Sequence, residues 1–395
     1  MGWYRVVGVI SGTSMDGVDV AVADLTVRGD TIDLVPVRHA QVPYPDDLRA
    51  ALTAALPPGD CSAETLCKLD TAVGQAFADA VIAVGTEGAD LVASLGQTLF
   101  HWVDGNRCRG TLQIGQPAWI AEATGLPVVA DFRARDVAAG GHGAPLALIL
   151  DRLLLFDPET PTAALNLGGI ANITVLTPDA PALAFDTGPG NALLDAAAQA
   201  RLGESHDVDG VLAAAGRVRE DLLGVLLADA YYAAPPPKST GKELFSSRYL
   251  SDALTHVPAV ADADLFATLV ALTATTVADA CRRHDVKKVV ASGGGVHNRA
   301  LLSALRAALD PVSVSTTDDL GLPVDAKEAY LAALLGFLTW SGIAVDPATG
   351  AAGPRLLGGI TPGARPVRLP DPIGGTPDRL RIVVPQPLGG LSART

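Results

Sequence analysis

Cysteine is scarce in this 395-residue sequence, and its few copies are scattered. The four cysteines, at positions 61, 67, 108 and 281, form no Cys-x-x-Cys pair and have no histidine partner at zinc-binding spacing. The sequence therefore defines no zinc site and no disulfide framework. We expect reduced thiols in a cytosolic protein.

Basic residues and long apolar runs are also lacking. The chain has 29 Lys and Arg against 43 Asp and Glu, a formal net charge of −14. An acidic chain is not attracted to phosphate backbones or anionic lipid surfaces, so we expect no nucleic-acid or membrane partner. We also expect no membrane span and no signal peptide, because no run of about eighteen apolar residues is present and the first residues lead directly into a predicted strand. The length predicts about two to three domains.

The sequence does contain a short polar turn between two strand-like runs near its start. Val6–Ile10 is apolar, and in Val18–Leu25 valines alternate with other residues. Between them, Ser11–Gly17 reads SGTSMDG; its glycines permit positive φ, which lets backbone N–H groups converge on an anion. Asp16 would face a phosphate only if a divalent cation lay between them. A glycine-rich turn alone is equally typical of an anion-binding turn and of an ordinary surface hairpin.

The segments that follow predict the mixed α/β order of a ribonuclease-H-like core. A third strand, Thr31–Val42, precedes helices at Asp46–Leu56 and Ser62–Val84, the second with Ser62 as its N-cap. A strand over Asp90–Leu95 then ends in Gly96–His101. Because ligands bind beyond the carboxyl ends of strands in such sheets, we expect this end to lie at the same edge as the first turn.

A second polar segment follows a predicted strand at Leu126–Phe132. Arg133, Arg135 and Asp136 precede a glycine-rich turn, a composition that suits an anionic or polyhydroxylated ligand but also a surface ion pair. We place a domain boundary near residue 130. The first domain is then 1–130 together with the Gly- and Pro-rich segment 344–395, which we expect to pack back on it, and the second is 131–343.

From Thr162 the strand–turn–strand pattern returns. Asn166–Asn172 reads NLGGIAN between two strand-like runs, and Asp186–Asn191 reads DTGPGN between a strand and a helix. The free N-terminus of that helix would suit an anion. Asp186, at the end of its strand, is a candidate general base, although it could merely cap the helix. The repetition predicts two like domains with Asp16 and Asp186 on opposite walls of a cleft.

Two later motifs fail the standard nucleotide-binding patterns. Pro235–Phe245 contains Ser-Thr-Gly-Lys, but Pro236 and Glu243 stand where a Walker A loop needs Gly and Ser or Thr. We predict a substrate-side loop there. Gly293–Gly295 lies at a strand-to-helix turn without G-x-G-x-x-G spacing, because Asn298 occupies the sixth position. Three glycines still allow a flat or phosphorylated ligand to approach the backbone.

The order of these motifs resembles that of one family. GTSMDGVDVA, GQTLFH, TLQIG, VVADFRARDVAAGGHGAPL, LNLGGIANIT, FDTGPGNALLD, KSTGKELF and SGGGVHN are similar to the motifs of the anhydro-N-acetylmuramic acid kinases, from about residue 5 to 362. The resemblance implies the actin, Hsp70 and hexokinase-like fold, in which two ribonuclease-H-like domains clamp ATP and Mg²⁺ in an interdomain cleft. It also implies a homodimer. The implied reaction hydrolyses the 1,6-anhydro ring of anhydro-N-acetylmuramic acid and phosphorylates O6, giving N-acetylmuramic acid 6-phosphate for recycling of cell-wall murein.

The resemblance also implies roles for single residues. Asp186 would be the catalytic base, and Asp16 would hold Mg²⁺. Arg133 would face the lactyl carboxylate of the sugar, with Arg135 as an alternative, and His142 stands where the family more often has Gln. The other sugar contacts would be Gln97, Thr98, His101 and Glu328. The nucleotide would be bound by Gly12, Thr13, Ser14, Met15, Asp16, Gly17, Val18, Asp19, Asn166, Gly168, Gly169, Gly188, Gly190, Asn191, Gly293, Gly294 and Gly295.

Two alternatives stay open at this point. One is another kinase of the same fold, hexokinase-like or acetate-kinase-like, but such an enzyme has no need of a hydrolytic water. The other is a non-catalytic sensor of sugars or nucleotides. A regulator of that kind usually carries an appended DNA-binding element, whereas this chain opens with its first strand.

Overall fold

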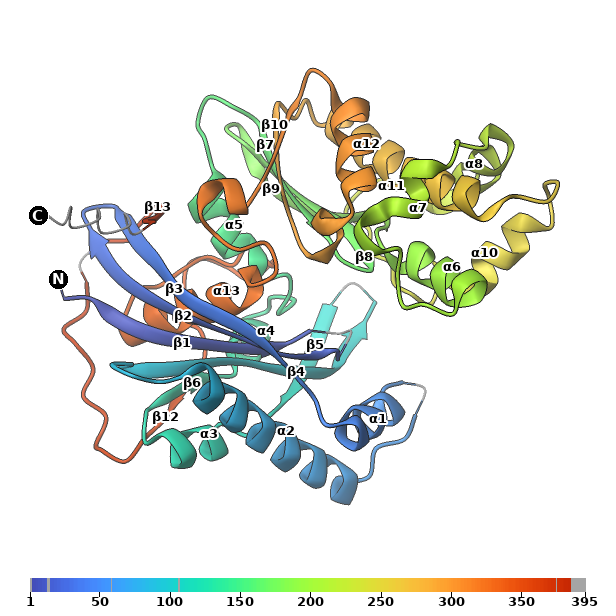
Figure 1. Ribbon diagram of the computed structural model, residues 1–395. Coiled ribbons are helices and arrows are strands. Elements are labelled where there is room, and N and C mark those ends of the chain that lie inside the picture. Colours follow the sequence, from blue (N-terminus) through green and yellow to red (C-terminus); the bar gives the residue numbers. More distant parts are fainter. Residues whose placement is uncertain (1, 13–14, 58, 106, 374, 385–395) are drawn as a thin grey trace, which may run out of the picture. The chain divides into compact units, whose positions relative to one another are not determined.

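The computed structural model describes residues 2–12, 15–57, 59–105, 107–373 and 375–384, which divide into two compact units (Figure 1). Unit 1 comprises the described residues up to Leu154 and those from Ala326 onward, and unit 2 is Leu155–Asp325. The predicted boundaries near residues 130 and 343 differ from these. The reason is that helices on either side of unit 2 in the sequence pack against the first sheet: α4 (Phe132–Ala138) contacts β5, and α13 (Lys327–Trp340) contacts β1.

Unit 1 is built on an eight-stranded sheet with the order β12-β6-β4-β1-β2-β3-β13, in which β5 also pairs with β4. The first three strands form an antiparallel meander, and β4 and β6 lie parallel to β1 on its other side. The strands are β1 (Tyr4–Ser11), β2 (Gly17–Arg28), β3 (Thr31–Pro43), β4 (Leu91–Asp104), β5 (Arg107–Ile114), β6 (Val128–Ala130), β12 (Gly359–Thr361) and β13 (Arg379–Ile382).

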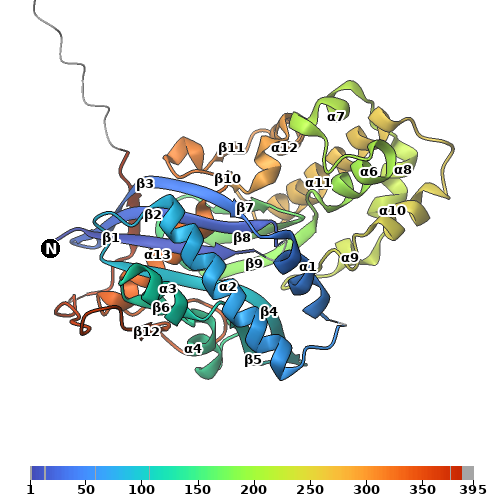
Figure 2. The same cartoon turned by 60° about the horizontal axis from the view of Figure 1, so that its bottom comes forward.

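Helices cover both faces of this sheet (Figures 1 and 2). On one face, α2 buries an apolar stripe that includes Phe77 and Val81 in a core shared with Val7 and Val20. Its N-cap is Ser62, as predicted: the Ser62 hydroxyl accepts from the Thr65 N–H at 3.1 Å. The helices of unit 1 are α1 (Asp46–Ala55), α2 (Ala63–Val84), α3 (Pro117–Thr124), α4, α5 (Ala147–Leu155, whose last residue belongs to unit 2) and α13.

On the opposite face lies α13, which is buried almost all round. Thirteen of its fourteen residues are buried, and the exception is Glu328. The helix approaches the sheet so closely that a Cβ added at Gly8 of β1 would lie 2.0 Å from the Ala329 carbonyl oxygen. In Figure 1 the orange helix α13 and the dark red strand β13 lie beside the blue strands β1–β3. The described part of the C-terminal segment lies on this sheet, where β13 pairs in parallel with β3.

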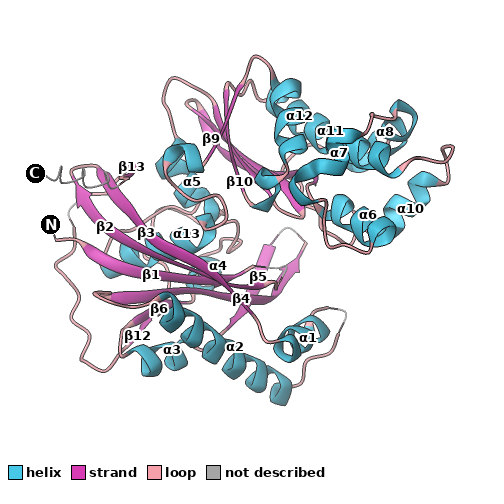
Figure 3. Cartoon of the chain, viewed as in Figure 1, coloured by secondary structure: helices cyan, strands magenta, loops and turns pink. Residues whose placement is uncertain are grey.

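Unit 2 repeats the core topology of unit 1 (Figure 3). Its sheet has the order β11-β10-β7-β8-β9, with β7–β9 antiparallel and β10 and β11 parallel to β7. The equivalent strands of unit 1 are β6-β4-β1-β2-β3, with the same directions. The predicted duplication and the ribonuclease-H-like core are thereby confirmed. The strands are β7 (Thr162–Leu167), β8 (Ile170–Thr177), β9 (Ala180–Pro189), β10 (Lys288–Ser292) and β11 (Ser313–Thr316).

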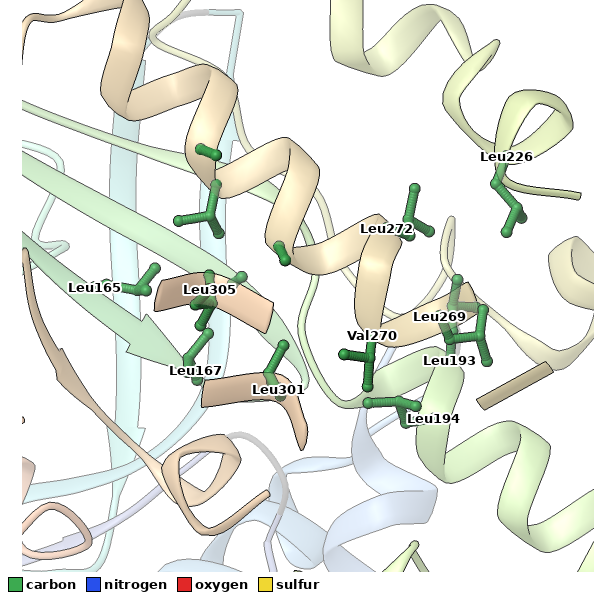
Figure 4. Close-up of a cluster of buried hydrophobic side chains, with 14 of the residues drawn as sticks. Leu165, Leu167, Leu193, Leu194, Leu226, Leu269, Val270, Leu272, Leu301 and Leu305 are labelled. Atoms are coloured by element: carbon green, nitrogen blue, oxygen red, sulfur yellow. The ribbon is translucent and has the colours of Figure 1, made fainter. Parts of the chain in front are cut away.

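The core of unit 2 forms where α11 and α12 pack with β7 and α6 (Figure 4). Leu269 and Val270 of α11 lie close to Leu193 and Leu194 of α6. The helices are α6 (Ala192–Leu202), α7 (Val211–Ala215), α8 (Glu220–Leu227), α9 (Ala230–Ala233), α10 (Ser247–Leu254), α11 (Asp262–Arg283) and α12 (Arg299–Leu309), with short 3₁₀ turns η1 (Val208–Gly210), η2 (Gly294–His297) and η3 (Asp318–Leu320).

Helix α11 bears on the expectation that the chain contains no membrane span. Among the described residues it is the one helix long and apolar enough, by length and composition alone, to cross a membrane. Of its most apolar window, 78% is buried inside the structure, and the core helix of a globular domain passes the same test of length and composition.

Candidate active site

In unit 1, the first predicted site is the turn between β1 and β2. The Met15 N–H donates to the Gly12 carbonyl at 3.1 Å, and Met15 has a positive φ of 54°. The side chains of Met15 and Val18 are buried in the apolar core, so these two residues present only their backbone to a ligand. Asp16 is exposed and its Oδ1 pairs with Arg49 at 2.9 Å. The remaining predicted residues of this turn are Gly17 and Asp19, which begin β2, and Thr13 and Ser14, which lie outside the described residues.

The buried side chain of Gln97 ties β4 to this turn. Its Nε2 donates to the Gly12 carbonyl at 3.2 Å and to the Thr98 carbonyl at 3.2 Å. Gln97 is fully buried, and its Oε1 has no hydrogen-bond partner among the described residues. A buried acceptor of this kind costs stability unless something else satisfies it. The strand end and the turn therefore lie together, as the sequence predicted.

The predicted strand end at Gly96–His101 differs from what the structure shows. β4 continues through these residues and pairs with β5 as a hairpin, with Thr98 opposite Gln113 and His101 opposite Thr111. The pairing with β5 satisfies the backbone that would otherwise form a loop. Alternation along the strand then places Thr98 and Gln113 on a shared polar face.

A hydrogen-bond network lines that polar face of the hairpin. The Gln113 Nε2 donates to Thr98 Oγ1 at 3.2 Å and to Thr111 Oγ1 at 2.8 Å. The Thr111 hydroxyl lies 2.9 Å from His101 Nδ1. Burial lowers the pKa of His101, and the positive charge of Arg133 lowers that pKa further, which favours the neutral imidazole at pH 7. Thr111 and Gln113 were not singled out from the sequence; the TLQIG motif that contains them was the available signal.

Arg133 joins the same group of residues, and Arg135 does not. Arg133 is half-buried near Glu328: burial lowers the pKa of its guanidinium, and the charge of Glu328 raises it. Its Nη1 donates to the Gly143 carbonyl at 2.8 Å, while its Nε is buried without a hydrogen-bond partner among the described residues. Arg135 is exposed. Both arginines lie on α4, where we had expected the end of a strand and a turn, and β6 contains only three residues.

Asp136 has a structural role in this segment. It is fully buried and pairs with Arg355 at 2.9 Å; its carboxylate also accepts from the Gly143 N–H and the Thr349 hydroxyl. These bonds tie α4 and the glycine-rich turn to the C-terminal segment, and complete burial keeps the carboxylate away from a ligand. His142, in the same turn, is exposed, and its N–H donates to the Thr349 carbonyl.

In unit 2, Asp186 lies within β9 and not at the end of a strand, because β9 continues to Pro189 opposite β8. A bulge between Ala171 and Asn172 of β8 lets Asp186 pair with Asn172. Its Oδ2 accepts the Thr240 N–H at 2.9 Å. Burial raises the pKa of Asp186, the Thr240 N–H lowers it, and the charge of Glu243 raises it. This carboxylate is oriented and partly desolvated, as a general base requires. Asp186 does not cap α6: its carboxylate accepts from the Thr240 N–H of a loop, and the N-cap residue of α6 is Asn191.

The predicted nucleotide-binding residues of unit 2 lie together at one end of its sheet. A Cβ at Gly293 would lie 2.6 Å from the Asn166 Oδ1, and a Cβ at Gly295 would lie 3.1 Å from the Asn191 Oδ1. Gly293 also has a positive φ of 86°, and a Cβ at Gly295 would lie 2.7 Å from the Leu167 Cβ, so glycine suits both positions. Gly294 lies in the same 3₁₀ turn, and Gly188 lies in β9 beside Ala171.

The N-terminus of α6 is not free, contrary to the sequence-based expectation. The N–H groups of Asn191 and Ala192 donate to the carbonyls of Gly168 and Gly169 at 2.9 Å each, and the Gly190 N–H donates to Gly169 at 2.9 Å. The β7–β8 turn thus satisfies the first of the donors that an anion would otherwise occupy, the N–H of Ala192, together with those of the two residues before it. A Cβ at Gly190 would lie 2.3 Å from the Gly168 oxygen, which explains the glycine.

The described residues contain no group of three or more His, Cys, Asp or Glu side chains that could hold a metal ion by themselves. Kinases hold Mg²⁺ with one or two carboxylates together with water and substrate phosphates. One exposed carboxylate, Asp16, fits such an arrangement if it exchanges its Arg49 partner for the ion.

Comparison with known proteins shows which family this sequence matches. A family model described as anhydro-N-acetylmuramic acid kinase matches residues 4–363. A Streptomyces coelicolor protein named anhydro-N-acetylmuramic acid kinase is 53% identical over 387 residues, covering 96% of this chain and 99% of that protein. A relative of the same name from Cupriavidus pinatubonensis is 42% identical, covering 91% of this chain and 98% of its own. Among solved structures, the xylulose kinase of Rhodospirillum rubrum matches with a TM-score of 0.44 at 13% identity, covering 85% of this chain and 90% of that one.

Proposed function

The chain belongs to the anhydro-N-acetylmuramic acid kinase family, and from this premise we propose how its residues carry out the family's reaction. The reaction cleaves the 1,6-anhydro ring of anhydro-N-acetylmuramic acid and phosphorylates O6 with ATP, giving N-acetylmuramic acid 6-phosphate and ADP for murein recycling. The observation that carries the proposal is the environment of Asp186: a partly desolvated carboxylate held by the Thr240 N–H at 2.9 Å.

Asp186 acts as the general base on a water molecule. The water oxygen forms a bond to C1 of the sugar as the C1–O6 bond breaks, and the water proton passes to Asp186. O6 then forms a bond to the γ-phosphorus of ATP, and the bond to the β,γ-bridging oxygen breaks to release ADP. Asp186 then releases the water proton to solvent, which regenerates the carboxylate, and no redox step is needed.

Residues of unit 1 bind the sugar. Gln97, Thr98 and His101 present hydrogen-bonding groups from β4, and neutral His101 can donate or accept. Arg133 is the group for the lactyl carboxylate because the Nε of its half-buried guanidinium has no hydrogen-bond partner in the described part of the chain, whereas Arg135 is exposed. Glu328, the exposed residue of the buried helix α13, would accept from a sugar hydroxyl or amide.

Glycine turns of both units bind the nucleotide. In unit 1 these are the residues from Gly12 to Asp19, and Asp16 would hold Mg²⁺, which supplies charge neutralisation at the phosphates. In unit 2 the residues Asn166, Gly168, Gly169, Gly188, Gly190 and Asn191 and the turn Gly293–Gly295 would receive the rest of the nucleotide. Their close mutual packing supports a preformed surface.

We further propose that the protein is a cytoplasmic homodimer. The acidic composition and the buried position of the long apolar helix α11 support a protein that works in water. Sedimentation at concentrations from about 1 to 50 µM would measure the oligomeric state, and a constant monomer mass over that range would contradict the dimer.

The decisive experiment follows the water oxygen. The protein is incubated with ATP, Mg²⁺ and anhydro-N-acetylmuramic acid in H₂¹⁸O, quenched rapidly, and the product is analysed by mass spectrometry. We expect one ¹⁸O at C1 for each phosphate transferred. Unlabelled product held in H₂¹⁸O for the same time corrects for exchange of its anomeric oxygen.

The same assay separates the alternatives. An ordinary sugar kinase would phosphorylate a reducing amino sugar and incorporate no label during turnover. A non-catalytic sensor would consume no ATP with any amino sugar tested. Either result would contradict the proposed reaction.

A further inference from the structure

The loop 235–245 of unit 2 carries a lysine with no role in the mechanism given above. Lys242 is exposed, and its ammonium has no hydrogen-bond or ion-pair partner among the described residues. Its side chain nevertheless lies over the β7–β8 turn. If Gly169 had a Cβ, that atom would lie 2.7 Å from the Lys242 Cε and 3.6 Å from Nζ.

The loop that presents Lys242 is held at both ends. On one side, the Lys238 ammonium donates to the Tyr231 carbonyl at 2.8 Å and lies 4.4 Å from the centre of the Tyr231 ring. On the other side, Phe245 is buried against the rings of Tyr231 and Tyr249. The two lysines of the motif are therefore not equivalent: Lys238 anchors the loop, and Lys242 remains available to a ligand.

The same loop also holds the catalytic base. The Asp186 N–H donates to the Lys238 carbonyl at 3.0 Å, and the Thr240 N–H donates to the Asp186 carboxylate at 2.9 Å. Thr240 and Lys242 are two residues apart, a backbone separation of at most about 7 Å. A single short segment thus positions a carboxylate that receives a proton and a cation that faces a glycine turn.

A free ammonium over a glycine turn suits an anion, because the turn adds no side-chain bulk and the cation supplies the charge. We infer that Lys242 binds the terminal phosphate group of the nucleotide and stabilises the charge on that group as it is transferred. The inference rests on the proposed function, since it assumes that the nucleotide phosphates reach the β7–β8 turn. The location beside Asp186 favours the terminal phosphate over the others, because the group attacked by O6 must lie near the base that starts the reaction.

The test compares Lys242→Met with Lys242→Arg. Methionine keeps the length of the side chain and removes the charge, whereas arginine keeps the charge. Lys287→Met is the matched control, because Lys287 is exposed in the same unit but precedes β10, at the end of the sheet opposite the glycine turns. Each variant is first checked for an unchanged melting temperature without nucleotide.

Two readouts are measured at one fixed Mg²⁺ concentration. The first is kcat, which we expect Lys242→Met to lower by about 10²- to 10³-fold and Lys242→Arg to retain within about tenfold. The second is the equilibrium affinity for a non-hydrolysable ATP analogue and for ADP. We expect Lys242→Met to weaken analogue binding by about 10- to 100-fold and to change ADP binding by less than about twofold.

The inference would be overturned by an unchanged kcat in Lys242→Met, or by equal losses of affinity for ADP and for the analogue. If Lys242→Met unfolds, Lys242→Gln replaces it in the same comparison. The binding measurement needs no sugar and no turnover. If the wild type is inactive but Lys242→Met still loses affinity for the ATP analogue and not for ADP, the proposed reaction is refuted and the binding role of Lys242 stands. If the wild type is active and Lys242→Met matches it in kcat and in both affinities, the proposed reaction stands and the role of Lys242 is refuted.

Discussion

Units 1 and 2 share one sheet topology but use the same sheet edge differently. In unit 1 the first hairpin turn presents Asp16, paired with an exposed arginine, and is held by the side chain of Gln97. In unit 2 the equivalent turn presents two glycine carbonyls, which accept the N–H groups at the start of α6. The comparison shows that topology fixes where polar groups gather, while the side chains of each copy decide which chemistry they perform.

The strands next to the central one also differ between the units. β4 of unit 1 extends beyond the core into a hairpin with β5 that carries Thr98 and His101. The equivalent β10 of unit 2 stops at Ser292 and turns through three glycines. Unit 1 therefore offers polar side chains at this edge, and unit 2 offers backbone groups and one oriented carboxylate.

The largest effect on kcat should come from substitution of Asp186, the oriented carboxylate of unit 2. Asp186→Asn removes the base but keeps an oxygen for the Thr240 N–H, so we expect kcat to fall by at least about 10²- to 10⁴-fold with ATP affinity unchanged. Asp252→Asn, on the exposed surface of α10, is the control. Steady-state kinetics and calorimetric titration of ATP make the measurement. A near-normal rate in Asp186→Asn would remove this residue from the role of base.

Replacing a glycine by alanine should change the free energy of unfolding in opposite directions at Gly8 of unit 1 and at Gly224 of unit 2. Gly8→Ala forces a methyl group against the Ala329 carbonyl, and we expect a loss of about 1–3 kcal/mol or more in the free energy of unfolding. Gly224→Ala is the control, because nothing lies within 4 Å of its Cβ position in α8; it should stabilise the protein by roughly 0.5–1 kcal/mol. Urea denaturation measures both. Equal stability of the two variants would contradict the close contact between α13 and β1.

A smaller effect is expected on the pH dependence of kcat, through the charge of Glu243 near Asp186. A base works only when ionised, and the pKa of Asp186 is raised, so activity should be lost as the pH falls through that value. Glu243→Gln removes a negative charge that raises the pKa, which should move the acidic limb of kcat to lower pH. The Thr240 N–H, which lowers the pKa, is unchanged in this variant. Glu220→Gln, exposed at the start of α8, is the control; an unmoved limb, or one moved to higher pH, would show that Glu243 does not act on the base.

The smallest effect concerns the turn of unit 1. Arg49→Ala removes an exposed ion pair, which should change the free energy of unfolding by less than about 1 kcal/mol. It also frees the Asp16 carboxylate, so the Mg²⁺ concentration needed for half-maximal activity should fall. Arg248→Ala breaks a comparable exposed pair on α10 and should leave the Mg²⁺ requirement unchanged. A rise in that requirement in Arg49→Ala would argue against Asp16 as the metal-binding carboxylate.

The sequence predicted the parts of the fold that depend on neighbouring residues. Both strand–turn–strand units, the Ser62 cap and the third strand of unit 1 follow from local periodicity and turn chemistry. The extension of β4 could not be predicted in this way, because Gly96–His101 becomes a strand only by pairing with β5. The domain boundary failed for a similar reason, since α13 joins unit 1 through contacts with strands some 300 residues earlier in the chain.

The candidate site shows the same division between local and distant effects. The glycine turns and Asp186 lie in motifs that can be read directly. The occupied N-terminus of α6 could not be, because its acceptors come from a turn more than twenty residues before it. Likewise, Asp136 stands beside Arg133 in a polar motif, and only the position of Arg355 shows that its carboxylate is part of the core.

The position of α13 has a consequence for how the polypeptide is made. The Tyr330 hydroxyl bonds the Arg38 carbonyl across 292 residues of sequence, and Gly8 contacts the same helix. During translation, one apolar face of the first sheet therefore stays uncovered until unit 2 has been synthesised and α13 emerges from the ribosome. Unit 2 is one continuous segment of the chain, so its core is complete as soon as that segment has been synthesised. The order of completion during translation is thus the reverse of the order of sequence, and the nascent first sheet is the species that a chaperone would need to shield.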